Sequence, residues 1–504
     1  DYEIKDPSLS DISAALHPTF TEQEIQTLDS NTGLARDLLG RQYLPGFVGL
    51  SNAGKTDYIN STVQALAHVR PLRDYFLRMS HKNTTVTVLS SSSSSSSKKK
   101  STTAKQKVPK PPHRMSNLVL CFGELVRKMW SDQRFKSNVD PHMLVQAISR
   151  ASKKKFQVGQ QAEVGEFMAW FLNQLHLGLG GTRKPGSSII YKVFQGKVHV
   201  TTQQSKRLDV SPEDDAKDDA SSAAAKINIQ PAGMSVEGDD NDAAKHKNRK
   251  ESETIVETVA ETNFLQLTLD IPEKPLFRDE DGGLVIPQEP LVTVMKKFDG
   301  ISFSDALSRS GLTQRKRYRL KELPSYLVLH LARFKTNNYS REKNPTIVAF
   351  PVKNLDLGSY TFPEKEAKPL PSENVVKGMS VKDIRSLLKK YGREDIAVQA
   401  VEKGDLVEAA VDFVCKSLPD LLADKYDLVA NITHDSPADV GREGKYDPLQ
   451  EGSYKCHVNH KASNQWYEIQ DLHVQEIMPQ LIGVSESYLM IFERKSAQQQ
   501  DLSQ

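Results

Sequence analysis

The chain has 504 residues, a length that suits two or three average domains or one large domain with insertions. Its formal net charge is +3, from 67 basic and 64 acidic residues, so charge alone points to neither nucleic acid nor a membrane surface as a partner. The three cysteines, Cys121, Cys415 and Cys456, include no C-x-x-C pair, which argues against a cysteine-rich zinc site and against a disulfide framework.

No apolar run of about 18 or more residues and no signal-peptide pattern occur, so we expect a soluble, intracellular chain. The sequence begins at Asp1 rather than at a methionine, and we expect it to be part of a longer protein. Hydrophobic residues make up 38% and charged residues 26%, a balance typical of a folded body combined with disordered segments.

The first predicted helix begins within 18–39, where Thr21 and Glu24 form a capping-box pattern. Pro45-Gly46 then interrupts the chain. The segment that follows is predicted to be a turn and a helix over about 61–77, because its apolar residues recur at helical spacing.

Helical periodicity predicts three further helices, at 116–130, 142–149 and 164–177. Strand-like alternation follows over 189–202, and a clear strand pattern returns at 264–269.

Two stretches have the composition of disordered insertions. At 88–114 a serine run is followed by three lysines and a Pro/Lys-rich tail. We favour a solvated linker there, with RNA contact or a nuclear localisation signal as the alternatives. At 205–255 the periodicity is lost in favour of Asp, Glu, Ala and Lys.

A third insertion, 364–424, contains two predicted helices. Ser380 and Asp383 form a capping box before the first helix, Gly392 marks its end, and 405–415 is an amphipathic second helix. The pair resembles a small SAP-like module, a group that includes nucleic-acid binders. We favour a structural or protein-contact insert.

Some residues could in principle supply chemistry. Cys456 and His457 are neighbours on a predicted strand, so their side chains point to opposite faces and cannot form a dyad. His457, His460 and His473 lie close in sequence, but no carboxylate or cysteine completes a metal-ligand set at suitable spacing. We favour surface or packing histidines over a metal site.

Several motifs occur in a fixed order along the chain. They are G-L-S-N-A-G-K-T-D-Y-I-N-S-T-V-Q-A-L at 49–66, Q-A-E-V-G-E-F at 161–167, L-P-S-Y-L-V-L-H-L-A-R-F at 323–334, V-A-F-P and L-D-L within 344–357, the strand 426–434, G-S-Y at 452–454 and W-Y-E-I-Q-D at 466–471. They resemble the cysteine box, the following helix and the later strands of the ubiquitin-specific proteases, the peptidase C19 family. The resemblance implies an α+β, papain-like fold with thumb, palm and fingers.

The chemistry of this family needs a cysteine nucleophile, a histidine base and an Asp or Asn that orients the histidine. On the matching positions the chain carries Asp57, Ser453 and Gln470. Carboxylate attack on an unactivated amide would form an unfavourable anhydride, and a serine has no pKa near neutrality with which to act as the base. The resemblance therefore implies a pseudo-protease with no catalytic residue.

Other family positions imply further expectations. Asn52 occupies the position that lines the oxyanion hole, and we expect it to support the local turn instead. Glu163 could approach Asp57. The fingers of active members carry two C-x-x-C pairs that bind zinc, whereas this chain has Thr-Thr-Gln-Gln at 201–204. We therefore expect zinc-less fingers and no metal or other cofactor.

The resemblance divides the chain into a lead-in at 1–45, a protease-like domain at 46–494 and a tail at 495–504. Relatives usually begin with a zinc-finger ubiquitin-binding domain, and the lead-in corresponds to the segment that follows that domain in them. The insertions at 88–114, 205–255 and 364–424 interrupt the protease-like domain.

The substituted triad, the missing zinc cysteines and six phrases point to one inactive branch of the family. The phrases lie at 46–50, 71–77, 169–173, 178–182, 342–348 and 470–472. That branch implies a nuclear splicing scaffold that supports assembly or stability of the U4/U6·U5 tri-snRNP. Implied partners are tri-snRNP proteins, including the U5 helicase and the large U5 scaffold protein, with snRNA nearby, no membrane and weak or absent ubiquitin binding. The alternatives are a residual deubiquitinase and a non-catalytic ubiquitin reader.

Overall fold

The computed structural model describes residues 8–79, 115–207, 253–273, 277–278, 284–307, 313–336, 341–361, 371–390, 396, 402–417, 424–436 and 447–495. The predicted insertion at 88–114 lies outside these residues, as do 208–252 of the second predicted insertion and 496–504 of the predicted tail. Expectations about those segments stay predictions. Within the described residues, no helix is both long enough and apolar enough to cross a membrane.

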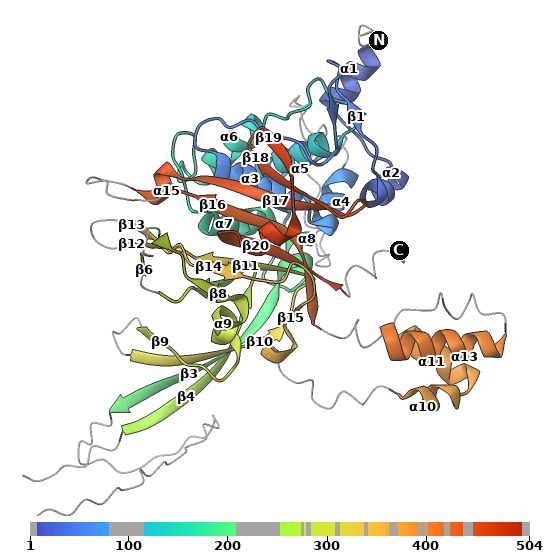
Figure 1. Ribbon diagram of the computed structural model, residues 1–504, viewed down its shortest axis with the longest axis vertical. Coiled ribbons are helices and arrows are strands. Elements are labelled where there is room, and N and C mark those ends of the chain that lie inside the picture. The colour runs from blue at the N-terminus through green and yellow to red at the C-terminus, as the bar shows by residue number, and fades with distance from the viewer. Residues whose placement is uncertain are drawn as a thin grey trace, which may run out of the picture.

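A sheet of eight strands runs through the body of the molecule (Figure 1). Seven strands follow the order β19 (His473–Ile477), β18 (Gln465–Gln470), β17 (Ser453–His460), β16 (Lys425–Asp435), β20 (Ser487–Arg494), β11 (Tyr326–Ala332) and β5 (Leu267–Asp270). Strand β15 (Leu355–Asp356) pairs with β16. All of these pairs are antiparallel except β11 with β5. This sheet corresponds to the palm that the sequence resemblance implies.

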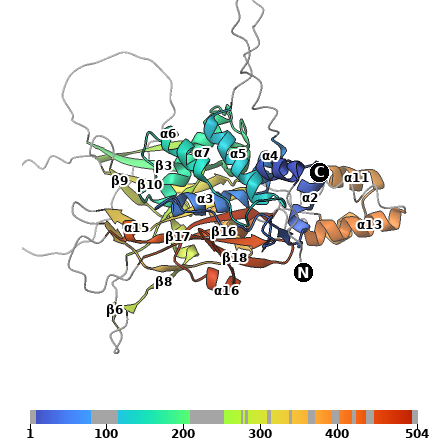
Figure 2. The same ribbon diagram turned by 90° about the horizontal axis from the view of Figure 1, so that it is seen from above.

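Helices cover one face of the sheet. They are α3 (Asp57–Ala67), α4 (Arg70–Arg78), α5 (Asn117–Trp130), α6 (His142–Ala151), α7 (Val164–Gly178) and α8 (Ile189–Phe194). Figure 2 shows α3 between the sheet and the outer helices, and α3 contacts both β17 and α7. All 11 residues of α3 are buried. Its polar side chains therefore need internal partners, and Gln64 Nε2 donates to Val48 O at 2.6 Å.

A second sheet projects from the body and corresponds to the fingers (Figure 1). Its strands follow the order β4 (Glu253–Phe264), β3 (Gly196–Arg207), β10 (Thr313–Glu322) and β9 (Ser304–Leu307). Four two-stranded sheets are β1 (Ala35–Arg36) with β2 (Gln42–Tyr43), β12 (Phe334–Thr336) with β13 (Arg341–Lys343), β14 (Ile347–Ala349) with β8 (Gln288–Pro290), and β6 (Phe277–Arg278) with β7 (Leu284–Val285).

Several of the remaining helices are short. They are α1 (Leu9–Leu16), α2 (Glu22–Thr27), α9 (Leu291–Met295), α15 (Pro448–Glu451) and α16 (Pro479–Ile482). Three more helices, α10 (Glu373–Lys377), α11 (Val381–Lys390) and α13 (Lys403–Asp412), share a small apolar core of their own. A core of this kind is what a small helical module needs, although its similarity to SAP modules stays a prediction.

Two larger cores lie on opposite faces of the eight-stranded sheet. Strand β11 shows the division, because side chains alternate between the faces of a strand. Tyr326 and Val328 belong to the core under the helices, whereas Leu327 and Leu329 belong to the core on the other face. The burial of both faces explains why this strand reads as an almost unbroken apolar run.

The structure bears out several predicted helices. The capping box of α2 is formed by Thr21 and Glu24. Helix α5 begins after Ser116, whose side chain caps it, and α7 spans Val164–Gly178. Each of these helices has either a side-chain cap at its start or a long periodic pattern, which are the features that sequence predicts best.

Two predicted elements have the wrong form. The helix predicted over 61–77 begins earlier, at Asp57, and is split at His68 and Val69, because Pro71 enters the first turn of α4 and cannot continue a preceding helix. The strand predicted over 189–202 begins only at Gly196.

The first part of that predicted strand is helix α8. Ser188 accepts a hydrogen bond from Tyr191 N and caps the helix, while Ile190, Val193 and Phe194 are buried at helical spacing. Both periods fit so short an apolar run, and the cap and the core decide between them.

The ends of the other strands also differ from those predicted. Residues 205–207 of the predicted second insertion pair with 253–255, so the two fingers strands are longer than their sequence patterns. Backbone pairing needs no apolar alternation, which is why the composition of 205–255 concealed it. The strand predicted over 264–269 is interrupted, because Phe264 ends β4 and Leu267 begins β5.

Candidate active site

The cysteine-like box forms a tight turn before α3. Asn52 Oδ1 accepts hydrogen bonds from Gly54 N at 2.8 Å, Thr56 N at 3.1 Å and Thr56 Oγ1 at 3.0 Å. Gly54 has a φ of 109° and Lys55 a φ of 51°, so the turn passes through left-handed backbone that the asparagine helps to fix. The turn places Asp57 at the first position of α3.

The Asp57 carboxylate is buried, with 4% of the residue exposed. Gln161 Nε2 lies 2.9 Å from each carboxylate oxygen, and Tyr454 N donates to Oδ2 at 2.7 Å. Burial raises the pKa of Asp57 above 3.8, an effect that the hydrogen bonds from Tyr454 and Gln161 oppose. The carboxylate therefore acts as a buried acceptor that ties the helix layer to β17.

The other two predicted triad positions lie beside it on neighbouring strands. Ser453 begins β17 and Gln470 ends β18. Gln470 Nε2 donates to Ser453 Oγ at 3.0 Å. The main chain that follows Ser453 supplies the Tyr454 N–H to Asp57. The structure thus brings Asp57, Ser453 and Gln470 into one cluster, in which neither a serine nor an amide can take a proton near neutral pH.

Asp471 also belongs to the site, although the sequence alignment placed Gln470 rather than Asp471 on the orienting position. Its carboxylate accepts from Asn60 Nδ2 at 2.8 Å and Asn52 Nδ2 at 2.9 Å, and its carbonyl accepts from Leu50 N at 2.8 Å. Because Asn52 donates its amide to Asp471, both ends of that side chain are used within the protein. The signal was available, since Asp471 immediately follows the aligned Gln470 in the last motif.

A bridge of hydrogen bonds joins α15 and the turn before α3 to Gln161, which itself binds Asp57. Lys55 Nζ donates to Gln450 O at 3.1 Å, and Gln450 Nε2 donates to Gln161 O at 3.2 Å. Gln161 Nε2 also reaches Gly452 O at 3.3 Å. Gln450 lies on α15, so this short helix is fastened to the helix layer. No sequence pattern indicated these contacts.

Comparison with known proteins assigns the chain to a family. Residues 48–496 match the family described as ubiquitin carboxyl-terminal hydrolase. The chain belongs to this family.

The ubiquitin carboxyl-terminal hydrolase fold is shared with splicing proteins. Human "Ubiquitin carboxyl-terminal hydrolase 39" is 35% identical over 497 residues, which cover 98% of this chain and 67% of that protein. "Probable mRNA-splicing protein ubp10" of Schizosaccharomyces pombe is 29% identical over 505 residues, covering 98% and 74%. The solved structure titled "Crystal structure of an essential yeast splicing factor" has a TM-score of 0.54 at 17% identity, covering 97% and 78%.

Glu163 contacts residues other than Asp57 in this hydrolase-family chain. Its carboxylate accepts from Tyr488 Oη at 2.5 Å and lies 3.2 Å from His330 Nε2, rather than bonding near Asp57. Burial raises the pKa of Glu163, but the hydrogen bonds from His330 and Tyr488 outweigh it, so the net pKa is lowered. Glu163 is therefore an ionised carboxylate that accepts a hydrogen bond from Tyr488.

His434 lies next to Gly452 and Tyr454, which adjoin the cluster. It lies on β16, its ring centroid is 4.6 Å from that of Tyr454, and it is fully buried. Burial lowers the pKa of His434 to about 3, which makes it a poor base at neutral pH. Burial also raises the pKa of the Cys456 thiol, which opposes formation of a nucleophilic thiolate.

The three clustered histidines are held by other contacts. His457 Nε2 lies 3.0 Å from Glu468, His460 bonds Ser463 and Asn31 O, and His473 pairs with Gln475. Among the residues that the structure describes, no group of three or more His, Cys, Asp or Glu is arranged to hold a metal ion. Each of the three histidines therefore has a hydrogen-bond partner within the protein.

Proposed function

We propose that the chain is a catalytically inactive ubiquitin-specific-protease-like scaffold of the spliceosome. It would act in the nucleus and support assembly or stability of the U4/U6·U5 tri-snRNP through contacts with tri-snRNP proteins. Support comes from the relatives, one of which is named as a probable mRNA-splicing protein at 29% identity over 98% of this chain. The U5 helicase and the large U5 scaffold protein are the partners we propose first.

The observation that carries inactivity is the state of Asp57. Its carboxylate is buried and held by Gln161 and Tyr454 at the position that matches the family's nucleophile. Next to it, Gln470 donates to Ser453, and this pair lacks a group that can accept the nucleophile's proton. In an analogous serine protease, loss of the triad leaves only about 10³–10⁴-fold acceleration over water. A residual deubiquitinase is therefore disfavoured.

The bridge across the site supports weak or absent ubiquitin binding. A substrate tail that approached Asp57 would have to displace the contacts of Gln450 with Lys55 and Gln161. A ubiquitin reader is accordingly the second choice. It predicts saturable ubiquitin binding below about millimolar concentration, whereas the scaffold proposal predicts none in that range.

Affinity purification tests the scaffold proposal. The tagged chain is purified from nuclear extract and the bound RNA is sequenced, with U1 snRNA as the internal control. The proposal expects U4, U5 and U6 snRNAs to be enriched over U1, both for the wild type and for Asp57→Asn, because no catalytic step is needed. Absence of enrichment, or its loss in Asp57→Asn when that variant folds normally, would contradict the scaffold.

A further inference from the structure

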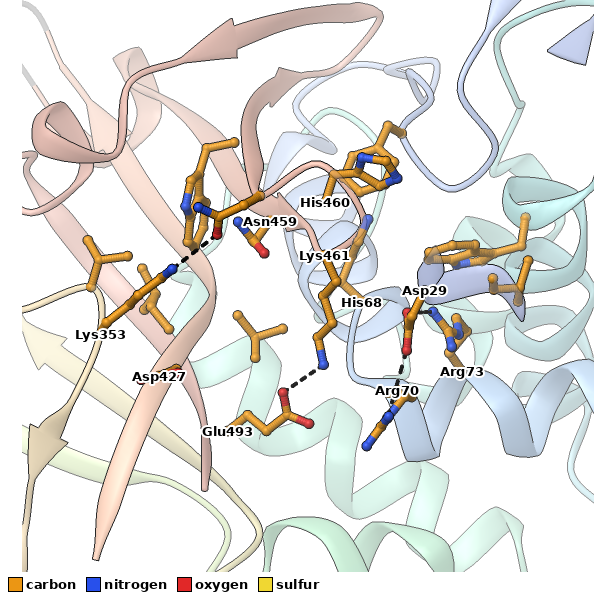
Figure 3. A pocket seen from close by; sticks show the side chains of 18 residues that line it. Asp29, His68, Arg70, Arg73, Lys353, Asp427, Asn459, His460, Lys461 and Glu493 are labelled. Carbon is orange, nitrogen blue, oxygen red and sulfur yellow. Dashed lines mark hydrogen bonds and ion pairs between the residues drawn. The ribbon is translucent and has the colours of Figure 1, made fainter. Parts of the chain in front are cut away.

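A second site lies at the far end of β17 from Ser453. A cavity of about 340 Å³ opens there, between α4 and the ends of β16, β17, β18 and β20 (Figure 3). Asn459 and His460 line it, six and seven residues along the strand from Ser453. At the rise of a β-strand this places it about 20 Å from the Asp57 cluster. It is therefore separate from the site that the family comparison addresses.

One wall of the cavity is aromatic and uncharged. The Phe47 ring lies 4.8 Å from that of His68 and 5.1 Å from that of His460, centroid to centroid. Burial lowers the pKa of His68 to about 4, so this ring is neutral at physiological pH. Trp130 and Trp466 complete the aromatic lining. Such a wall favours contact with an apolar or aromatic side chain.

Charged side chains also line the cavity, one of them, Arg73, over the Trp130 ring, and most of their charge is already neutralised inside the protein. The lining contains four cations, Arg70, Arg73, Lys353 and Lys461, and three carboxylates, Asp29, Asp427 and Glu493. Four cations against three carboxylates leave one positive charge, which sets the sign of the ligand that the cavity favours.

Two of the carboxylates are paired with cations of the lining, and the third, Asp427, lies 3.7 Å from Lys495 outside it. Asp29 is bound by Arg73 at 2.7 Å, with Arg70 3.8 Å away on its other oxygen. Glu493 is fully buried and paired with Lys461 at 2.7 Å. These paired carboxylates do not supply charge to a ligand without breaking an existing ion pair.

Lys353 differs from the other cations. Its side chain is exposed, and Nζ donates to the neutral amide oxygen of Asn464 at 3.2 Å. Figure 3 shows Lys353 on the side of the cavity opposite Arg70 and Arg73. The neutral amide leaves the charge of the ammonium uncompensated, so a carboxylate that approaches Lys353 adds the attraction between opposite charges.

We propose that this cavity binds a short acidic peptide segment of a partner protein, through one carboxylate at Lys353 and one adjacent apolar or aromatic side chain against the aromatic wall. The inference rests on the proposed scaffold function, for which it supplies a docking point. The volume is at the lower end of ligand pockets, about 300–1,000 Å³, which suits one or two side chains.

A peptide is favoured over nucleic acid by the charges of the wall. A nucleic acid brings repeated phosphates, and its affinity depends on several cations that neutralise them together. Here the carboxylates of Asp29, Asp427 and Glu493 lie in the same lining and balance three of its four cations, so one net positive charge remains for a polyanion. A single carboxylate needs only that one charge, and an apolar neighbour can contact the aromatic wall.

Tryptophan fluorescence gives a direct assay, because two of the chain's three tryptophans, Trp130 and Trp466, line the cavity. The purified full chain is titrated with capped Gly-Phe-Asp-Gly, with its Asn and Lys counterparts, and with an octauridine RNA. The proposal expects a saturable change for the Asp peptide and binding about two- to fivefold weaker for the Asn peptide, as for loss of one exposed ion pair. The Lys peptide and the RNA should bind more weakly still.

Variants locate the binding. Lys353→Glu should weaken the Asp peptide at least about tenfold, and Arg70→Gln is a second lining variant. Lys184→Glu, which reverses an exposed lysine outside the cavity lining, is the matched control and should bind as the wild type does. Thermal unfolding of each variant checks its fold, and the exposed Lys353 decides the result if Arg70→Gln misfolds.

Equal binding by Lys353→Glu and wild type, tighter binding of the Asn peptide, Lys peptide or RNA, or no fluorescence change with any probe would overturn the proposal. These results are separable from the scaffold test. Enrichment of U4, U5 and U6 snRNAs without peptide binding rejects the docking site alone. Peptide binding without snRNA enrichment rejects the tri-snRNP role and leaves the pocket standing.

Discussion

Replacement of Asp57 by asparagine separates a structural carboxylate from a chemical one. Asparagine keeps the size of the side chain and one acceptor oxygen, but it turns the other oxygen into a donor facing Gln161 Nε2. Gln161 Oε1 is buried and has no hydrogen-bond partner among the described residues. Rotation of the Gln161 amide would therefore let it accept from the new amide group, while Tyr454 N still donates to the remaining oxygen.

The expected magnitudes follow from these contacts. In Asp57→Asn the rotated Gln161 loses its 3.3 Å bond to Gly452 O, whereas the cost of burying a carboxylate disappears. The free energy of unfolding should stay within about 1 kcal/mol of the wild type at pH 7. Asp57→Ala instead leaves Tyr454 N and Gln161 Nε2 without their acceptor. At about 1–3 kcal/mol for each of the two buried donors, we expect a loss of roughly 2–6 kcal/mol.

The comparison should also depend on pH. Burial holds the folded-state pKa of Asp57 above 3.8, so the folded chain binds this proton more tightly than the unfolded chain does. The free energy of unfolding of the wild type therefore falls as the pH rises from the unfolded-state pKa of Asp57, near 3.8, through its higher folded-state pKa. Asparagine does not titrate. Asp57→Asn should gain stability relative to the wild type as the pH rises from about 4 to 7.

Urea unfolding of the three proteins at several pH values provides the measurement, and equal slopes in urea show that the same surface is exposed. The reasoning fails if Asp57→Asn loses as much stability as Asp57→Ala at pH 7, because the negative charge itself would then be required. It also fails if the difference between Asp57→Asn and the wild type is constant from acid to neutral pH.

Two further substitutions test neighbouring contacts. Glu163→Gln weakens the hydrogen bond from Tyr488 and should lower the free energy of unfolding by about 1–3 kcal/mol at neutral pH. Because the pKa of Glu163 is lowered from 4.5 in the folded chain, this loss should shrink as the pH falls below 4.5. Urea unfolding at neutral pH and at a pH below 4.5 measures it, and an equal loss at both would contradict the prediction. A Cβ on Gly452 would lie 2.2 Å from the His434 ring, so Gly452→Ala should cost about 1–3 kcal/mol. Gly404→Ala, with nothing within 4 Å of its Cβ, should be neutral or stabilising in thermal unfolding, and a similar loss in both glycine variants would count against the close packing.

Sequence predicted the elements whose pattern is long or whose ends are marked. Helix α7 has a full periodic stripe, and α2 and α5 have side-chain caps. The order of the motifs also predicted that 57, 453 and 470 would meet, since a family frame fixes which strands are neighbours. The strand predicted at 189–194 was wrong because both the helical and the strand period fit six residues. Only the cap at Ser188 and the surrounding core decide in favour of the helix.

Contacts between distant segments were beyond sequence analysis. The bridge from Lys55 through Gln450 to Gln161 joins residues about 290 to 400 positions apart, and no local pattern marks its members. The partners of Glu163 likewise depend on where β11 and β20 place His330 and Tyr488. The cavity beside Lys353 arises where four strand ends meet α4, so its composition could be collected only after the fold was known.

Reaction with a ubiquitin probe that carries a C-terminal electrophile tests inactivity most directly. The full chain is incubated with the probe and analysed by intact-mass spectrometry, with an active member of the family as the positive control. The account predicts that the mass of the chain stays unchanged while the control is fully converted. A covalent adduct that maps to any residue of this chain, Asp57 or Cys456 included, would contradict it.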